Sequence, residues 1–443
     1  MPLAGESITL PFSRCLEDWG NAFAHLPGFV YLDSGCNTPD AERELVTALP
    51  TRCYQLRDYS GSATDWMTAI EKDLAAAQLP ASDGRFNGAA VVGCLEYDAT
   101  ADALRGDTTN QRQSVARLYH WGLMTELETR QTTLQFHPDC PAVTREHIKA
   151  IVENNNREPQ ASTAFGLSRP FEPCISRDQY RSAIGRIHEY ILAGDCYQVN
   201  FAQRFEAAAY GDPWHAYRVA RQRLAGGFSG FLRAAQDEAI LSLSPERFLQ
   251  VKDGVVISQP IKGTAPRHED PEADRAAAAT LMASVKDRAE NVMITDLLRN
   301  DIGQFCVPGS VRVTELCGLY SFSNVHHLIS TVEGRLADNI SAGQVMVATS
   351  PGGSITGAPK KRAVEIIKEL ESHPRRAYCG SLFIMLGNNS LQSSIAIRTL
   401  EMRGERLYCW GGGGITASSD WAAEYQETLD KVGPIMRLLE QTS

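Results

Sequence analysis

Residues 176–205, "SRDQYRSAIGRIHEYILAGDCYQVNFAQRF", change from a helical pattern of apolar positions to a strand pattern. Ser176 is a favourable N-cap residue, and apolar residues recur at helical spacing until Gly194. Beyond that glycine the residues alternate as they do in a strand. The pattern predicts a helix that begins after Ser176 and is followed directly by a strand.

Two segments have the alternation and turn residues of β-hairpins. "ERFLQVKDGVVISQPI" turns at Asp253-Gly254, and "LQSSIAIRTLEMRGERLYCWGGGGI" is closed by "RGER". Lys262 follows on the predicted return strand of the first hairpin, between Ile261 and Gly263. Its neighbours favour the interior and its amine favours water, so the lysine is a candidate for chemistry.

Long helices accompany these strands. The segment 270–301 begins with Asp270 before Pro271, has an alanine-rich body and predicts one helix. A last helix is predicted from about Ser419, with a bend near Gly433-Pro434. Helices mixed with hairpin-connected strands predict an α+β fold with a largely antiparallel sheet.

The chain is expected to divide near its first third. Residues 151–173 are polar, asparagine-rich and interrupted by prolines, which predicts a segment crossing between two parts. Residues 1–150 form the first part and carry little motif content. Residues 174–440 form the second part and contain the motifs described below.

Composition limits the class of protein. Of the 443 residues 43% are hydrophobic and 22% charged, which is typical of a globular protein, and the net charge of −10 disfavours nucleic acid or a membrane surface as a partner. The first residues show no secretory signal pattern, and no apolar run is long enough to cross a membrane. The 11 cysteines are scattered without a CxxC pair, which favours free thiols in a reducing, cytoplasmic compartment.

Two acidic pairs have a spacing that suits a metal site. Asp287 and Glu290 are three residues apart on one predicted helix, and Glu424 and Glu427 are three apart on the last helix. If the two faces met, their oxygens would suit Mg²⁺. For either pair alone, a solvated helix face is the commoner explanation.

Other polar and glycine-rich positions leave alternatives open. Glu246 in "SLSPERFL" is either an acid with a raised pKa or a surface residue paired with Arg247. Arg398 either binds a substrate carboxylate or pairs with an internal acid. His326 and His327 are expected to hydrogen-bond and not to bind Mg²⁺.

Two glycine-rich stretches are candidate anion sites. The run Gly411–Gly414 either exposes backbone N–H groups to an anion or forms a flexible turn. "SPGGSITGAPKKR" fails as a nucleotide-binding phosphate loop, because Ala358 stands where the lysine is required. It remains a glycine-rich loop that leads into a helix N-terminus.

Taken together, these motifs resemble those of the chorismate-utilising enzymes. The resemblance rests on "SLSPERFL", "PIKGT", "KDRAENVMITDLLRNDIG", "VHHLIS", "PGGSITGAPKKRAVEII", "IAIRTL", "GGGGI" and "EYQETLDK". It covers about residues 175–435, and "FVYLDSG" extends it loosely into the first 150. It implies large antiparallel sheets packed as a sandwich with surrounding helices.

Lys262 separates the branches of this family. Anthranilate synthases typically have alanine at that position, and aminodeoxychorismate synthases have lysine. Isochorismate-type members use a lysine where this chain has Gln198. The resemblance therefore implies amination of chorismate at C4. An anthranilate synthase component and a non-catalytic amino-acid-binding homologue are the alternatives.

The resemblance also assigns roles to residues. It implies Mg²⁺ on Glu290 and Glu427, with Asp287 and Glu424 contributing directly or through water, Lys262 as a nucleophile at C2, and Glu246 as a general acid. The residues implied to bind substrate are Arg398, Tyr378, Ser354, His327, Gly412, Gly414 and Lys431. Trp410, before the glycine run, stands where a smaller residue is expected, and it points either to the pocket rim or into the core.

Partners follow from the same resemblance. Chorismate is the implied substrate, and its amination needs ammonia. The sequence has no glutaminase motif of the GxCxGxQ kind and no lyase segment, so a separate glutamine amidotransferase subunit and a separate lyase are expected. The family's first part can bind tryptophan, and the sequence leaves open whether this chain does.

Overall fold

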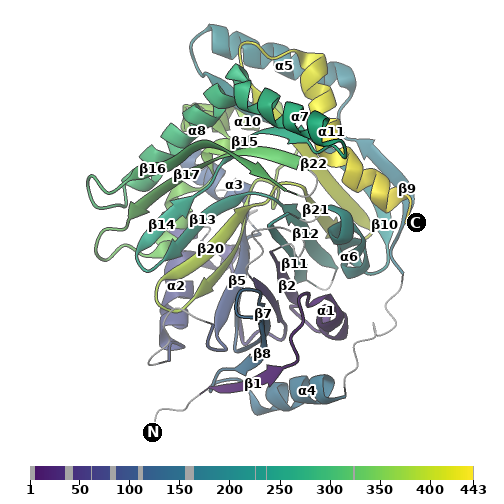
Figure 1. The fold of residues 1–443 in the computed structure, drawn as a ribbon, viewed down its shortest axis with the longest axis vertical. Helices are drawn as coiled ribbons and strands as arrows, with labels where there is room; N and C mark the ends of the chain where they lie inside the picture. The colour runs from purple at the N-terminus through teal and green to yellow at the C-terminus, as the bar shows by residue number, and fades with distance from the viewer. Residues whose placement is uncertain are drawn as a thin grey trace.

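The computed structural model describes residues 5–34, 43–60, 62–79, 86–107, 113–154, 164–224, 226–235, 237–322 and 325–442. Within these residues the strands form two large sheets, and every pairing between neighbouring strands is antiparallel. The α+β class and the antiparallel sheets expected from the sequence are confirmed (Figure 1).

The first sheet contains strands from both the beginning and the end of the sequence. Its strands, in spatial order, are β1 (Glu6–Leu10), β8 (Gln131–Phe136), β7 (Trp121–Glu126), β3 (Arg43–Thr47), β2 (Val30–Asp33), β11 (Phe228–Ala235), β12 (Glu238–Ser244), β21 (Thr399–Arg403), β22 (Arg406–Ile415), β10 (Gln198–Tyr210) and β18 (Gly357–Ala358), and β9 (Gly166–Pro173) also pairs with β10.

The second sheet has the same mixture of early and late strands. Its order is β15 (Ile261–Pro266), β17 (Val325–Arg335), β14 (Val255–Ser258), β13 (Arg247–Lys252), β20 (Ser390–Ile395), β19 (Ser381–Leu386), β5 (Ala90–Leu95), β6 (Val115–Tyr119) and β4 (Arg52–Gln55), and β16 (Arg312–Ser321) also pairs with β17. Strands from before residue 150 and after residue 174 thus share both sheets.

Helices pack against the strands of both sheets. They are α1 (Glu17–Phe23), α2 (Ala63–Ala76), α3 (Tyr97–Arg105), α4 (Ala142–Glu153), α5 (Arg177–Leu192), α6 (Pro213–Leu224), α7 (Pro271–Ala283), α8 (Val285–Gly303), α9 (Ala342–Thr349), α10 (Lys360–Leu370) and α11 (Trp421–Glu440), with the short 3₁₀ helices η1 (Leu56–Tyr59) and η2 (Gly353–Ile355). None of the helices in the described ranges is long and apolar enough to span a membrane.

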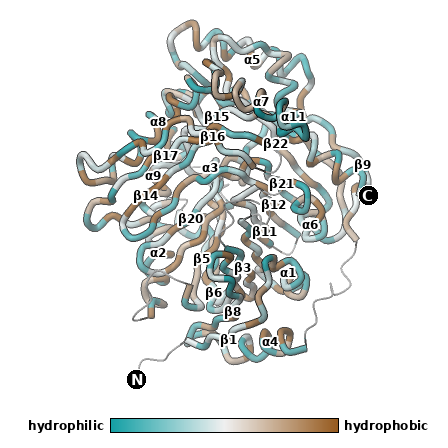
Figure 2. The backbone as a smooth tube through the Cα atoms, viewed as in Figure 1, coloured by the Kyte–Doolittle hydropathy of each residue, from teal (hydrophilic) through white to brown (hydrophobic). Residues whose placement is uncertain are grey.

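An apolar core holds the two sheets face to face. Val30 and Ile240 of the first sheet pack with Val92 and Leu382 of the second in one buried cluster. Such burial of strand faces is the main force that joins two sheets into a sandwich. Hydrophobic and hydrophilic residues are interspersed along the chain (Figure 2), and some strands, such as β5 and β6, are buried along their whole length.

Local start signals predicted from the sequence are confirmed. Ser176 forms a capping box with Gln179 at the start of α5, and Asp270 accepts hydrogen bonds from Glu272 and Ala273 at the start of α7. The last helix begins after Asp420 and continues through Pro434 to Glu440.

The predicted first hairpin is confirmed, but its return strand is shorter than expected. Asp253 and Gly254 both have positive φ, as a tight turn requires, and they join β13 to β14. Strand β14 ends at Ser258, and Lys262 lies on the next strand, β15. Pro260 explains the break, because proline has no N–H to donate to a ladder.

Two other predicted elements are each divided at one residue whose backbone conformation differs from that of its neighbours. The helix expected over 270–301 breaks at Ser284, which is extended and caps α8 by accepting from Asp287 N. The strand expected through "SIAIRTL" breaks before β21, where Arg398 has φ +50° and the chain passes from the second sheet to the first. Only the β21–β22 turn of that hairpin forms as predicted.

The predicted crossing segment 151–173 contains regular structure at both ends. Its first residues complete α4, and its last eight form β9 beside β10. Residues 155–163 lie outside the described part of the chain. The cysteines in the described ranges are free thiols, as predicted.

Candidate active site

Elements distant in sequence converge at one end of the sandwich. Strand β15 carries Lys262, the turn before β13 carries Glu246, and η2 carries Ser354. Helices α8 and α11, which supply the two acidic pairs, lie over β15 and β22 at the same end (Figure 1). The convergence brings most of the predicted site residues into one region.

Lys262 lies among charged groups of both signs. Its Nζ donates a hydrogen bond to the Ser354 carbonyl oxygen at 3.0 Å. Burial lowers the pKa of this amine; nearby Glu246 opposes that shift and Lys431 adds to it. A lowered pKa increases the fraction of free amine, the nucleophilic form.

A glycine next to Lys262 lets α8 approach the strand. Gly263 has φ +89°, and a Cβ added there would lie 3.0 Å from the Asp287 Cβ. A residue with a side chain would therefore be strained and would displace α8. Gly263 helps to keep the acidic pair of α8 close to Lys262.

Glu246 is a buried acid whose own backbone N–H and carbonyl form hydrogen bonds to neighbouring residues. Its side chain is 5% exposed, its N–H donates to Ser244 Oγ, and its carbonyl accepts from Ile395 N. Burial raises its pKa, while Lys262 and a hydrogen bond from Ser354 oppose the rise. The alternative of a surface glutamate paired with Arg247 is not what the structure shows.

The four carboxylates implied for a metal, those of Asp287, Glu290, Glu424 and Glu427, lie in the same region but do not form one coordination site. Among the described residues, no three His, Cys, Asp or Glu side chains lie close enough together to hold a metal ion as they stand. Instead Ser284 donates to Asp287, Ser419 donates to Glu424 at 2.6 Å, and Lys431 lies 2.7 Å from Glu427.

Glu290 differs from its neighbours because one of its oxygens is buried without a hydrogen-bond partner in the described structure. Burial raises its pKa, while the charges of Lys262 and Lys286 partly oppose the rise. Glu427 has a lowered pKa, because its ion pair with Lys431 outweighs burial. An unsatisfied carboxylate oxygen on α8, within electrostatic range of the Glu427 carboxylate on α11, fits a ligand for a hard divalent cation.

The glycine run lies between α11 and β10. A Cβ added at Gly413 would lie 3.1 Å from Glu424 Oε2, whereas one at Gly414 would lie 2.5 Å from Gln198 Nε2. Gly412 accepts a hydrogen bond from Lys431 at 2.9 Å. Gly413, which was not among the residues predicted from the sequence, is the glycine of the run that faces the acids of α11, because faces alternate along a strand.

Gln198 is a second residue without a predicted role. It is fully buried, and both polar atoms of its amide lack a hydrogen-bond partner among the described residues. Its amide lies against Gly414, beside the predicted substrate region. A buried, unsatisfied amide at such a position is a candidate for contact with a bound molecule.

Arg398 and His327 lie near each other, within electrostatic range. Of the two alternatives for Arg398, an internal ion pair is not found, since none of the described carboxylates lies within 4.0 Å of it. Burial and the Arg398 charge lower the pKa of His327 to about 4. Its Nδ1 lies 2.8 Å from Thr264 Oγ1, and His326 bonds Ser321 and Asp274, so both histidines hydrogen-bond as predicted.

Trp410 points into the core and not to a pocket rim. It is 2% exposed and stacks on Tyr378, with ring centroids 5.9 Å apart and an angle of 8° between the planes. Tyr378 is itself 4% exposed. The bulky residue before the glycine run therefore supports Tyr378 from behind.

Comparisons with known proteins agree on one family. The profile of the chorismate binding enzyme family matches residues 31–437. Aminodeoxychorismate synthase component 1 of Klebsiella aerogenes is 44% identical over 393 residues, covering 86% of this chain and 84% of the relative. The same component of Salmonella typhimurium is 39% identical over 454 residues, covering 98% of each.

A solved structure supports the fold at lower identity. Anthranilate synthase component I from Streptococcus pneumoniae has a TM-score of 0.73 and 24% identity, over 99% of this chain and 93% of that one. The residues matched by the family profile include β15 with Lys262, α8, and the part of α11 that carries Glu424 and Glu427. The chain belongs to the chorismate binding enzyme family.

Proposed function

We propose that the chain aminates chorismate at C4 to give 4-amino-4-deoxychorismate, the precursor of para-aminobenzoate. The observation that carries the proposal is the proximity of Lys262, an amine with a lowered pKa, to Glu246, a carboxyl with a raised pKa. The names of the Klebsiella and Salmonella relatives support the same reaction. In this proposal the lysine is the nucleophile and the glutamate is the acid.

The proposed chemistry has two displacements. The free amine of Lys262 forms a bond to ring C2, both conjugated ring double bonds shift toward C4, and the C4 hydroxyl leaves as water with the proton of Glu246. Ammonia then bonds to C4, both double bonds shift back, and Lys262 is expelled as a free amine. Glu246 accepts the proton that the new C4 ammonium group loses, so both residues return to their starting states.

Glu290 and Glu427 would hold Mg²⁺, with Asp287 and Glu424 contributing directly or through water. When bound, the ion supplies a Lewis acid for the ring carboxylate. In this proposal Lys431 and Ser354 would hydrogen-bond substrate carboxylates, together with Arg398, Tyr378 and the backbone at Gly412 and Gly414. His327, neutral because of its lowered pKa, would line the ring pocket.

The ammonia is expected from a separate subunit. The relatives are described as component 1, which supports a second component, and a glutamine amidotransferase would supply ammonia to this chain. Tryptophan binding in the first part and a cytoplasmic location remain predictions.

Product analysis tests the proposal. Incubation with chorismate, Mg²⁺ and ammonium should give 4-amino-4-deoxychorismate, identified by mass and by conversion with a lyase. Formation of anthranilate would instead assign the chain to the anthranilate synthase branch. Absence of any turnover, together with tight tryptophan binding, would favour the non-catalytic alternative.

A further inference from the structure

Arg375 lies in the connection between α10 and β19 and is buried, with an exposed fraction of 1%. Its Nε and Nη2 donate to the two carboxylate oxygens of Glu371, at 2.9 and 2.6 Å. This bidentate ion pair compensates the charge of the guanidinium. The same guanidinium makes further hydrogen bonds, and these go to the backbone of two other elements.

The further hydrogen bonds of Arg375 reach the candidate active site. Nη1 donates to the Ile355 carbonyl at 2.8 Å, and Nη2 donates to the Asn200 carbonyl at 2.7 Å. Ile355 ends η2 and follows Ser354, whose carbonyl accepts from Lys262 Nζ at 3.0 Å. Asn200 lies on β10, opposite the glycine run of β22. One planar cation thus joins η2 to the strand beside the glycine run.

Arg375 also lies against Tyr378, one of the residues predicted to bind substrate. Its guanidinium carbon is 5.9 Å from the Tyr378 ring centroid, and its backbone carbonyl accepts from the Tyr378 N–H at 3.0 Å. The guanidinium carbon is 4.6 Å from the ring centroid of Tyr97 on α3. Arg375 therefore contacts two segments of the candidate site, η2 and the turn that carries Tyr378.

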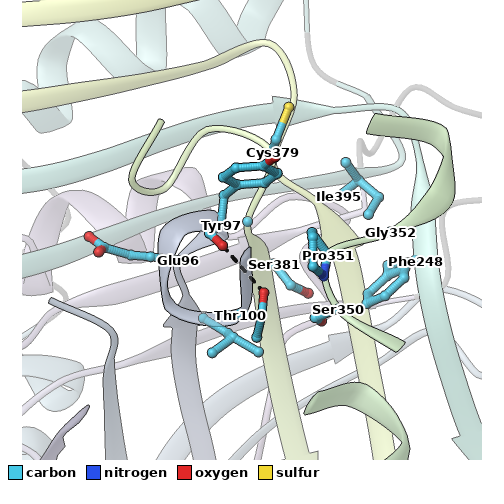
Figure 3. Close-up of a pocket in the computed structure, with 12 residues that line it drawn as sticks. Glu96, Tyr97, Thr100, Phe248, Ser350, Pro351, Gly352, Cys379, Ser381 and Ile395 are labelled. Atoms are coloured by element: carbon cyan, nitrogen blue, oxygen red, sulfur yellow. Dashed lines mark hydrogen bonds between the residues drawn. The ribbon is translucent and has the colours of Figure 1, made fainter. Parts of the chain in front are cut away.

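Packing alone leaves a gap at the boundary of these two segments. A void with room for about one water molecule is bordered by Ser350 and Gly352, which lead into η2, and by Tyr97 and Cys379 (Figure 3). Atoms that face a void lose the contacts that would otherwise fix the distance between its walls. The hydrogen bonds of Arg375 fix a distance at this boundary.

The position of η2 matters because both proposed reactive side chains contact it at Ser354. Lys262 Nζ donates to the Ser354 carbonyl. Burial raises the pKa of Glu246, and a hydrogen bond from the Ser354 side chain partly opposes the rise. A small displacement of η2 would therefore change both contacts at once, and small misplacements of reacting groups lower rates by large factors.

We propose that Arg375 is a positioning residue of the reaction, whose planar guanidinium fixes the η2 backbone and, through Ser354, the two reactive side chains. The inference rests on the proposed function, in which Lys262 and Glu246 act on the ring. The N–H groups of a guanidinium point in fixed directions, so one arginine holds two carbonyls and a carboxylate together. A lysine in its place would keep the charge that pairs with Glu371 and lose the link to η2.

The variant Arg375→Lys tests this link. With saturating chorismate, Mg²⁺ and ammonium, it should lower kcat by about tenfold or more. Arg117→Lys is the matched control, because Arg117 is also buried and donates to two backbone carbonyls, those of Arg233 and Ala234. It joins β6 to β11, and neither strand carries a predicted site residue. The control should keep kcat within about twofold.

A second readout does not depend on turnover. The pKa of the Lys262 amine can be measured by acetic anhydride labelling across pH with peptide mass spectrometry. It should be lower in Arg375→Lys, because the amine loses a carbonyl acceptor that favours its charged form. Arg117→Lys should leave it unchanged. The substitution keeps the charge at residue 375 and every charged group that shifts the pKa of Lys262, which are Glu246, Lys431, Glu290 and Glu427.

A double variant guards against a folding defect caused by an unpaired Glu371. Arg375→Gln combined with Glu371→Gln removes both charges of the buried pair, so no uncompensated carboxylate is left, and it also removes the guanidinium from η2. It should lower kcat and the pKa of Lys262 as the single variant does. Thermal unfolding and circular dichroism show which variants are folded.

Each remaining outcome overturns the inference or separates it from the proposed function. Normal kcat in either folded variant overturns it. A lower kcat with an unchanged or raised pKa of Lys262 also overturns it, because the effect would then be a general loss of packing. Failure of both variants to fold would assign Arg375 to the fold alone. If the unmodified protein forms no aminated product, the proposed function fails, whereas the labelling experiment still tests the link from Arg375 to η2.

Discussion

Two groups of charges in this molecule, one around the buried Arg221 and one around the half-buried Lys262, are built differently. Arg221 on α6 donates to Asp33 on β2, to Glu44 on β3 at 3.1 Å and to Glu17 at 3.0 Å, so a buried cation is surrounded by acids in direct contact. Lys262 has none of the described carboxylates within 4.0 Å, and its hydrogen bond goes to the neutral Ser354 carbonyl.

The difference separates a structural from a reactive arrangement of charge. At Arg221 the contacts satisfy the cation and join α6 to two strands, and removing one partner would leave uncompensated charge. At Lys262 the acids lie near enough to shift the pKa but do not hold the amine in an ion pair. An amine left free in this way can react with carbon.

The largest effect is expected at the reactive lysine. Lys262→Ala should lower the rate of amination by roughly 10³-fold or more, because the nucleophile is lost. Thermal unfolding should remain close to that of the unmodified protein. Lys252→Ala, an exposed lysine of the same sheet, serves as the control, and normal turnover by Lys262→Ala would make the lysine only a charge stabiliser.

The structural cluster should respond in stability. Arg221→Met should lower the free energy of unfolding by about 3–5 kcal/mol, because Asp33 and Glu44 lose their cation. Denaturant unfolding measures this loss.

The loss at Arg221 should also depend on pH. Burial raises the pKa of Glu44, so folding favours the protonated form of this carboxyl. The stability that the protonated carboxyl contributes is lost as pH rises and Glu44 ionises. The defect should therefore be smaller at pH 5 than at pH 8. An equal loss at both values would show that Arg221 acts by packing alone.

Removal of the proposed acid, Glu246, should lower the rate less than removal of Lys262 does. Glu246→Gln should lower kcat about 10²-fold, a typical contribution of one general acid. In the unmodified protein kcat/KM should fall at low pH, where Lys262 is protonated, and at high pH, where Glu246 is ionised. Because glutamine does not ionise, the alkaline fall should be absent in the variant, and its persistence would assign that limb to another group.

The smallest of these effects is expected at the proposed metal site. Glu290→Gln should weaken Mg²⁺ binding about tenfold, measured by calorimetry without substrate, because one charged oxygen ligand is lost. Asp296→Asn, on the exposed face of the same helix, should bind as the unmodified protein does. Equal affinities in the three proteins would exclude Glu290 as a ligand.

Features encoded locally were predictable from the sequence. Ser176, Asp270 and the Asp253-Gly254 turn specify their elements through side chains or backbone preferences within a few residues. The break at Ser284 has a local signal too, because serine is a good N-cap, but the helical pattern on both sides concealed it.

Features fixed by tertiary packing were not predictable. The left-handed backbone at Arg398 arises where the chain changes sheets, and the burial of Trp410 behind Tyr378 depends on the turn that precedes β19. The site residues were found through motifs, while their contacts, such as Lys262 with Ser354, needed the fold.

The central claim is that Lys262 bonds to the ring during turnover. Mass spectrometry of protein quenched during reaction with chorismate, Mg²⁺ and ammonium tests it directly. The account predicts a substrate adduct on the peptide that contains Lys262, absent from Lys262→Ala. An unmodified Lys262 peptide in protein that is turning over, at concentrations where the adduct should accumulate, would contradict the claim.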